Sequence, residues 1–131
     1  MNPFNENGSV LTADIALVRG ALTDVLSVAI TPTANDKKIR IAVSIFGYIS
    51  SENAGNIMRW QLFRNNIDIT NSNETNPTSS TAVDGGNEPA LAWLIDEPAS
   101  DVEVTYKLQL RAVMLTVEVE KGTSLYVREL H

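Results

Sequence analysis

Apolar and polar side chains alternate along the C-terminal segment of the chain with almost no interruption. Every second residue of 102–110 is apolar, and the residues between them are charged or polar. The alternation continues over 115–120 and, after a turn at Lys121-Gly122, over 125–130. Successive side chains of a strand point to opposite faces, so a period of two is typical of strands that bury one face. The segment predicts three consecutive strands that form a meander.

Shorter stretches with the same alternation precede this segment. Residues 15–30 favour two short strands separated at Arg19-Gly20, although a short helix over 12–19 is an alternative. Residues 39–50 predict a long central strand. Further strands are predicted over residues 57–64, 67–70 and 91–95.

Turn residues separate these strands. Asn65-Asn66 predicts a tight hairpin, because Asn tolerates the positive φ that such a turn requires. Residues 71–89 are polar and form a connection longer than most loops in compact domains, so they are either a surface excursion or an interface element.

The number and spacing of these segments predict the fold class. About eight short strands without a convincing helix indicate an all-β domain, with a two-sheet antiparallel β-sandwich as the expected architecture. A chain of 131 residues is long enough for one domain with its own core. Residues 1–14 are expected to be a flexible N-terminal arm, and residues 15–131 the folded domain.

Composition argues against several classes of function. Without cysteine the chain has no disulfide, thiolate nucleophile or cysteine-ligated metal. A net charge of −6 with scattered basic residues argues against nucleic acid as a partner. The sequence has neither a long apolar span nor a signal peptide, so we expect no membrane partner and synthesis in a cytoplasm.

Candidate catalytic and metal-binding residues are few. The single histidine is the terminal residue His131, which makes a catalytic triad improbable and excludes a multi-histidine zinc site. Asp96, Glu97 and Asp101 share one turn and could bind calcium, but a hydrated loop is the favoured interpretation. A glycosidase carboxylate pair stays open as an alternative. We expect no enzyme activity and no cofactor.

Aromatic side chains occur where the strand pattern expects polar ones. Phe46, Tyr48, Phe63 and Tyr126 all fall on the face opposite the expected core. Either loops of the same chain cover them, or they line a subunit interface, where aromatic residues are enriched. We take these four residues as the candidate interface for self-association.

Three segments carry a resemblance to a known family. They are Trp93-Leu94-Ile95-Asp96-Glu97-Pro98, residues 104–111 with the sequence Val-Thr-Tyr-Lys-Leu-Gln-Leu-Arg, and residues 122–130, which close the chain with Glu129-Leu130. Their order resembles the small trimeric jelly-rolls of the tumour-necrosis-factor and C1q-like type, and in particular their versions in tailed-phage virions. The resemblance covers residues 37–130.

The resemblance implies a jelly-roll topology and a homotrimer within a virion. In virions such a module serves as a decoration (cement) protein on the head shell or as a fibre or spike tip. The first role is favoured, because no coiled-coil or repetitive β region precedes residue 15. It would bind the major capsid protein or other virion proteins, with Phe4 as the capsid-attachment residue. In the alternative role, the tip would bind a receptor or carbohydrate through residues 71–89 and Trp93.

Overall fold

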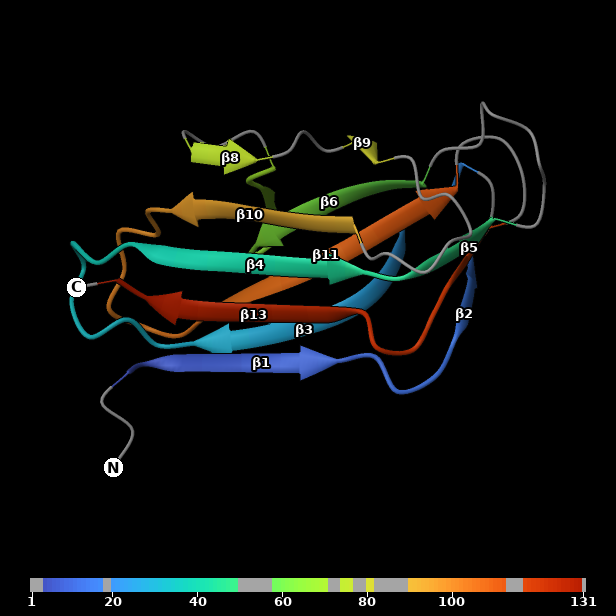
Figure 1. The fold of residues 1–131 in the computed structure, drawn as a ribbon. Coiled ribbons are helices and arrows are strands. Elements are labelled where there is room, and N and C mark those ends of the chain that lie inside the picture. Colours follow the sequence, from blue (N-terminus) through green and yellow to red (C-terminus); the bar gives the residue numbers. More distant parts are fainter. Residues whose placement is uncertain are drawn as a thin grey trace.

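A computed structural model gives the fold of the chain (Figure 1), and every regular element in its described part is a β-strand. Within that part, no helix could cross a membrane. The described residues are 4–17, 20–49, 58–70, 74–76, 80–81, 90–112 and 117–130.

Two larger sheets and one small sheet make up the fold. The first large sheet contains, in spatial order, β1 (Glu6–Val10), β13 (Ser124–Glu129), β4 (Ile39–Ile45), β10 (Ala90–Asp96) and β8 (Glu74–Asn76). The second contains β3 (Thr23–Ile30), β11 (Val104–Ala112), β6 (Met58–Arg64) and β7 (Ile67–Asp68), with β9 (Ser80–Thr81) also paired to β6. The small sheet contains β2 (Ile15–Leu17), β12 (Val117–Val119) and β5 (Gly47–Ile49).

The chain passes back and forth between the two large sheets. Strands β1, β4, β10 and β13 belong to the first sheet, and β3, β6, β7 and β11, which alternate with them along the chain, belong to the second. The orders β1-β13-β4-β10 and β3-β11-β6-β7 are those of a jelly roll, and the pairings within them are antiparallel. The predicted antiparallel β-sandwich and its jelly-roll topology are therefore confirmed.

The small sheet is made from three crossings between the large sheets. Strand β2 follows β1, β5 follows β4, and β12 connects β11 to β13. Figure 1 shows β2 and β5 together at the end of the sandwich opposite the chain termini. The predicted strand over residues 39–50 is consequently two strands, because the chain leaves the first sheet after Ile45 and joins the small one.

The predicted C-terminal meander is wrong, although its strands exist. β11 pairs with β3 and β6, β12 with β2 and β5, and β13 with β1 and β4, so the three strands lie in three different sheets. Alternation indicates which face of a strand is buried and carries no information about its neighbour. The apolar faces of β11 and β13 are buried against each other because the two strands lie in opposite layers. A meander would have placed both strands in one sheet.

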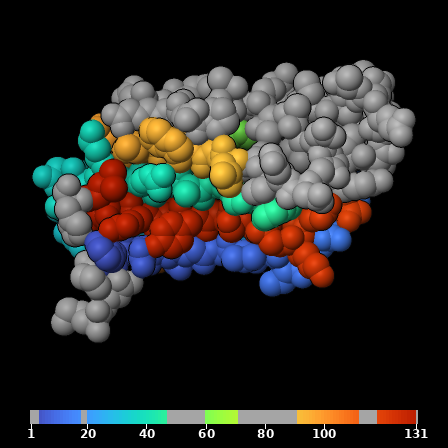
Figure 2. All heavy atoms as spheres, in the orientation of Figure 1, coloured from blue at the N-terminus to red at the C-terminus, as the bar shows by residue number. Residues whose placement is uncertain are grey.

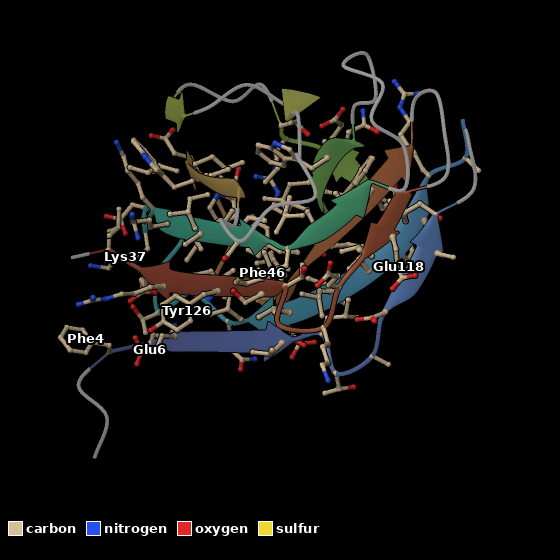
Figure 3. All side chains as sticks on the ribbon, turned by 45° about the vertical axis from the view of Figure 1, so that its right-hand side comes forward. Phe4, Glu6, Lys37, Phe46, Glu118 and Tyr126 are labelled. Carbon is tan, nitrogen blue, oxygen red and sulfur yellow. The ribbon has the colours of Figure 1, made fainter. Side chains whose placement is uncertain are left out.

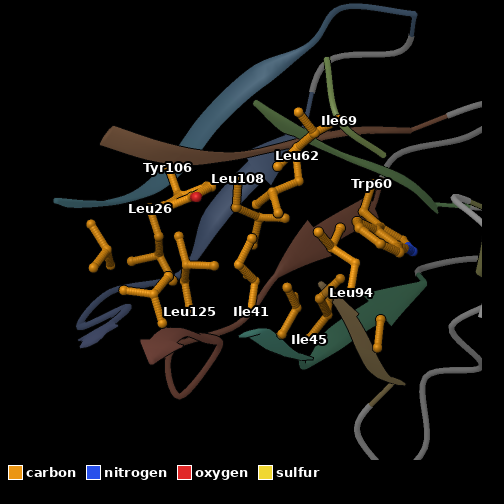
Figure 4. Close-up of a cluster of buried hydrophobic side chains, with 14 of the residues drawn as sticks. Leu26, Ile41, Ile45, Trp60, Leu62, Ile69, Leu94, Tyr106, Leu108 and Leu125 are labelled. Atoms are coloured by element: carbon orange, nitrogen blue, oxygen red, sulfur yellow. The ribbon is translucent and has the colours of Figure 1, made fainter. Parts of the chain in front are cut away.

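Alternating side chains of both sheets fill the space between the layers (Figure 4). Ile41 of β4, Leu108 of β11 and Leu125 of β13 are fully buried, as their positions in the pattern predict. Each buried aliphatic side chain contributes roughly 1.5 to 3 kcal/mol by leaving water. Val102 departs from the pattern, because β11 begins two residues later and the Val102 side chain is exposed.

The N-terminal segment differs most from its prediction. Residues 6–10 of the predicted arm form β1, an edge strand paired in register with β13 from Glu6–Arg128 to Val10–Ser124. Side-chain amides support it, because Asn5 and Asn7 donate to the carbonyls of Thr31 and Ala29 at 2.7 and 2.9 Å. Backbone hydrogen bonds hold this segment in place although it is poor in apolar residues. Composition does not reveal such bonds.

The hairpin between β6 and β7 is as predicted. Asn65 and Asn66 have φ values of 47° and 70°, the two positive values of a tight primed turn. The Asn65 side chain also accepts a hydrogen bond from the Thr105 amide at 2.9 Å. The turn is thereby fixed against the neighbouring strand β11.

Candidate functional site

A groove crosses the outer face of the first large sheet, the face that Figure 2 views. Its volume is about 560 Å³. Strands β10, β4 and β13 form its floor and walls, so it lies on the side of the sheet that faces away from the core. The lining residues are Arg40, Ala42, Val43, Ser44, Leu91, Ala92, Trp93, Ser124 and Tyr126.

Strand register explains why the groove is hollow. Ala42 of β4 stands opposite Trp93 of β10 on one side and opposite Tyr126 of β13 on the other. A methyl side chain between two aromatic ones leaves a low floor between two walls. In a neighbouring row Ser44 lies between Leu91 and Ser124, so the floor stays low along β4.

Arg40 lies at one end of this groove. Its guanidinium carbon is 5.9 Å from the centre of the Trp93 ring, a cation–π distance. Arg40 of β4 stands opposite Arg128 of β13. None of the carboxylates whose side chains the structure describes forms an ion pair with Arg40. Glu74, which follows Ile95 in the same cross-strand row, has its side chain outside that part.

Tyr126 is fixed by the edge strand (Figure 3). Its hydroxyl donates a hydrogen bond to Glu6, and this bond, followed by partial desolvation, raises the pKa of the Tyr126 phenol. Its ring lies over Gly8, where an added Cβ would be 3.0 Å from a ring carbon. An aromatic ring that covers an edge glycine orders the strand pair, so the Tyr126 wall of the groove depends on β1.

Phe4, the predicted attachment residue, lies at the end of the sandwich where β1 begins (Figure 3). Its ring is 38% exposed and is stacked on the guanidinium of Arg128, 3.8 Å from the ring centre. The structure therefore presents an exposed aromatic ring beside a cation at this end.

Glu129, at the same end, is a buried carboxylate with its own donors. It accepts hydrogen bonds from the Thr33 amide at 2.6 Å and from the Thr33 hydroxyl at 2.8 Å. Burial alone would raise the pKa of Glu129, but these bonds, with Asn5 and the charge of Lys37, outweigh burial and lower the pKa. Glu129 thus joins the last strand to the connection between β3 and β4.

The four aromatic residues predicted as an interface do not form one patch within the chain. Phe63 is half-buried on β6 of the second sheet, whereas Tyr126 lies on the outer face of the first. The Phe46 ring packs beside Gly122, where an added Cβ would be 3.6 Å away, so a turn of the same chain partly covers it. The side chain of Tyr48 lies outside the described residues.

Trp93 and Tyr126, predicted for different roles, line the same groove on opposite sides of Ala42. Sequence patterns place each residue on a face of its strand, but the pairing of β10 with β4 and of β13 with β4 brings them together. Arg40 and Ala42 were missed, because an arginine and an alanine on a polar face carry no signal until their neighbours are known. Of residues 71–89, predicted as part of the same surface, the structure describes β8 and β9, and His131 lies outside the described chain.

The last residue of β10, Asp96, forms a buried ion pair with Arg64 of β6. Asp96 is 3% exposed, and its carboxylate lies 2.6 Å from the guanidinium of Arg64. The same carboxylate accepts a hydrogen bond from the Tyr106 hydroxyl at 2.7 Å. Burial, and then the hydrogen bond to Asp96, raise the pKa of the Tyr106 phenol. This buried carboxylate fits neither the calcium site nor the hydrated loop considered for the segment. Among the described residues, no group of three or more His, Asp or Glu side chains is placed to hold a metal ion.

A second acidic cluster lies on the small sheet. Glu118 shares a hydrogen bond with Asp14, which raises the pKa of Glu118. Asp14 also accepts a hydrogen bond from the Lys121 amide at 2.7 Å. Asp14 is exposed and Glu118 is half-buried, and Glu118 lies at the opposite end of the sandwich from Phe4 (Figure 3).

Comparison with known proteins gives one structural relative of note. The sequence matches no family model, and no curated protein matches it. The structure is similar to that of VP2 in the crystal structure of the infectious bursal disease virus VP2 subviral particle, with a TM-score of 0.65 and 10% sequence identity. The chain shares its fold with a viral particle protein.

The similarity covers 99% of this chain and 33% of the VP2 chain, so this chain spans about a third of the length of its relative. At this identity the comparison is evidence about the fold alone, which is a jelly-roll β-sandwich. The jelly-roll fold that the resemblance implied is supported at that level.

Proposed function

We propose that the chain is a structural protein of a virus particle, namely a trimeric decoration (cement) protein that stabilises the head shell of a tailed phage. The observation that carries the proposal is that nearly the whole chain aligns with part of a protein that forms a subviral particle. It would be synthesised in the host cytoplasm and act in the virion. Its partners would be its own copies and the major capsid protein or other virion proteins.

Particle composition tests this proposal. Quantitative mass spectrometry of virus particles purified from the source should find the chain at a copy number comparable to that of the major capsid protein. Absence of the chain would refute a virion role. A few copies per particle would instead favour the second candidate function, a receptor- or carbohydrate-binding fibre or spike tip, for which the groove beside Trp93 is the supporting observation.

The trimer would use two different surfaces of each subunit, since a closed ring of three joins unlike patches. Phe63 and Tyr126 on opposite faces are compatible with this arrangement, and Phe46 and Tyr48 complete the proposed set. Light scattering should give three times the chain mass of 14.3 kDa. Phe63→Asp should lower that mass by burying an unpaired charge, whereas Phe63→Leu should not. An unchanged mass in Phe63→Asp would remove Phe63 from the interface.

Shell attachment would use the end of the sandwich that carries the termini, with Phe4 as the anchor. Phe4→Ala should weaken binding to decoration-free particles and leave the melting temperature nearly unchanged. Leu22→Ala is the matched control, because Leu22 is a similarly exposed apolar residue, at 43% against 38% for Phe4. Equal binding by both variants would move the attachment surface elsewhere.

A further inference from the structure

We propose that the groove on the outer face of the β10-β4-β13 strands binds an acidic saccharide, whose ring stacks on Trp93 and Tyr126 and whose carboxylate pairs with Arg40. The inference concerns a ligand of the folded protein. It goes beyond the proposed role in the shell, names the ligand class for the second candidate function, and requires the Tyr126 ring to stay accessible in the oligomer.

The groove must recognise its ligand with side chains. Its floor is β4, which is paired with β13 on one side and β10 on the other. The wall β13 is also paired with β1, and the wall β10 is paired with β8 over Trp93–Ile95. Because the backbone groups of these paired segments serve the sheet, they offer no free edge to an added peptide strand. A ligand that lies across the strands contacts rings, hydroxyls and a guanidinium instead.

That set of groups fits a sugar ring. A pyranose has an apolar C–H face, which packs on the electron-rich face of an aromatic ring, and Trp93 and Tyr126 supply two rings across the Ala42 floor. The hydroxyls of Ser44 and Ser124, which line the same groove, can donate to and accept from sugar hydroxyls. A volume of about 560 Å³ lies within the range of small-ligand sites, roughly 300 to 1,000 Å³.

Charge selects an acidic sugar. Arg40 lines the groove beside Trp93, so its planar guanidinium is placed to form a bidentate pair with a ligand carboxylate. The net charge of −6 opposes a densely charged polyanion such as nucleic acid. Because the groove lining contains one cation, Arg40, the favoured ligand presents one carboxylate to the site, as a single uronic acid ring does.

The first experiment compares two probes on the native oligomer. An oligomer of glucuronic acid and the matching neutral oligomer of glucose are titrated by calorimetry, with the contact residues mapped by amide and indole NMR shifts. We expect the acidic oligomer to bind about tenfold more tightly than the neutral one, a typical effect of one charge-assisted pair. The shifts should be centred on strands β10, β4 and β13.

Variants identify the groups that carry the binding. Arg40→Gln should remove the tenfold preference and leave weak binding of both probes, whereas Trp93→Ala should remove binding of both. Ala42→Leu fills the groove floor while all the recognition side chains are kept, and it should also block both probes. Arg111→Gln is the control for loss of an arginine elsewhere, because Arg111 lies on the outer face of the opposite sheet; it is half-buried, whereas Arg40 is exposed. Melting temperatures show that each variant is folded.

Four results would overturn the inference. The first is that neither probe binds, and the second is that the preference for the acidic probe survives Arg40→Gln. The third is that the NMR shifts map outside the three strands. The fourth is that NMR signals of groove residues shift with protein concentration and no probe alters them. The last result would show that a second copy of the chain fills the groove. None of them bears on particle composition, so the shell proposal is tested separately.

Discussion

The two outer faces of the sandwich use their side chains differently. On the second sheet, polar groups pair with one another across strands: the Gln109 amide donates to Asp24 at 2.5 Å, and Lys107 lies 3.7 Å from the same carboxylate. On the first sheet, Arg40, Trp93 and Tyr126 line an open groove. The first pattern pairs its polar groups with one another, whereas the second places a cation and two aromatic rings along a groove.

A single irregularity helps to produce the self-paired face. The register of β11 against β3 shifts between Leu108 and Gln109, whose partners are Leu26 and Asp24, so β3 contains one extra residue. Without that bulge Asp24 would share the buried face of Leu26. The bulge turns Asp24 outward to Gln109 and Lys107. Local backbone geometry, as well as composition, therefore decides on which face of a sheet polar side chains find partners.

The largest expected effect separates the two tryptophans. Trp60 is fully buried on β6, whereas Trp93 is half-buried on the groove face of β10. Trp60→Ala should reduce the free energy of unfolding by about 3 to 5 kcal/mol. Trp93→Ala should reduce it by about 1 kcal/mol. Chemical denaturation measures both, and equal losses would mean that the groove face is structural.

The ion pair that joins the two sheets should come next. Arg64→Ala leaves the buried Asp96 carboxylate without its cation and should cost about 3 to 5 kcal/mol of unfolding free energy. Lys38→Ala breaks the exposed pair with Glu97, 3.3 Å apart, and should cost less than about 1 kcal/mol. Similar costs for both variants would show that Asp96 finds water in the folded protein.

Deletion of residues 1–10 should have a smaller but clear effect. It removes β1, and with it the backbone pairing to β13 and the Gly8 and Glu6 contacts of Tyr126. We expect a loss of about 2 kcal/mol or more from these hydrogen bonds. Calorimetry measures the shift in melting temperature. A truncated protein that melts like the intact one would mean that β1 contributes no stability to the groove face.

The smallest effects concern pH and have opposite signs. The folded pKa of Glu129 is lowered, so its stabilisation is present above the unfolded pKa of about 4.3 and is lost as pH falls through the folded pKa. The folded pKa of Glu118 is raised, so its contribution is present below the unfolded pKa and is lost as pH rises through the folded pKa.

Denaturation of two variants across pH measures both signs. Glu129→Gln should destabilise the protein at neutral pH and have little effect in acid. Glu118→Gln should stabilise it at neutral pH and also have little effect in acid. Effects of the same sign at neutral pH would contradict the hydrogen-bond assignments at Thr33 and Asp14.

The sequence predicted local features of the fold well. Alternation identified the faces of β4, β11 and β13, and Asn65-Asn66 predicted its turn, because both depend on neighbouring residues alone. The edge strand β1 was not predicted, since backbone hydrogen bonds with almost no apolar burial leave no compositional trace.

The site was harder to predict than the fold. The groove requires Trp93, Ala42 and Tyr126 in one row, and that row exists only because three strands distant in sequence pair in a particular register. The Arg64–Asp96 pair likewise joins two sheets. Single-strand patterns contain neither relation, so Trp93 and Tyr126 could be selected as candidates but not brought together.

Hydroxyl-radical footprinting with and without the glucuronic acid oligomer tests most directly whether the two faces differ in function. Leu91 at the groove and Ile67 on the second sheet are similarly exposed, at 67% and 57%, and therefore make a matched pair of reporters. The account predicts that the saccharide protects Leu91, together with Tyr126, and leaves the reactivity of Ile67 unchanged. Protection of Ile67 with Leu91 still reactive would contradict it.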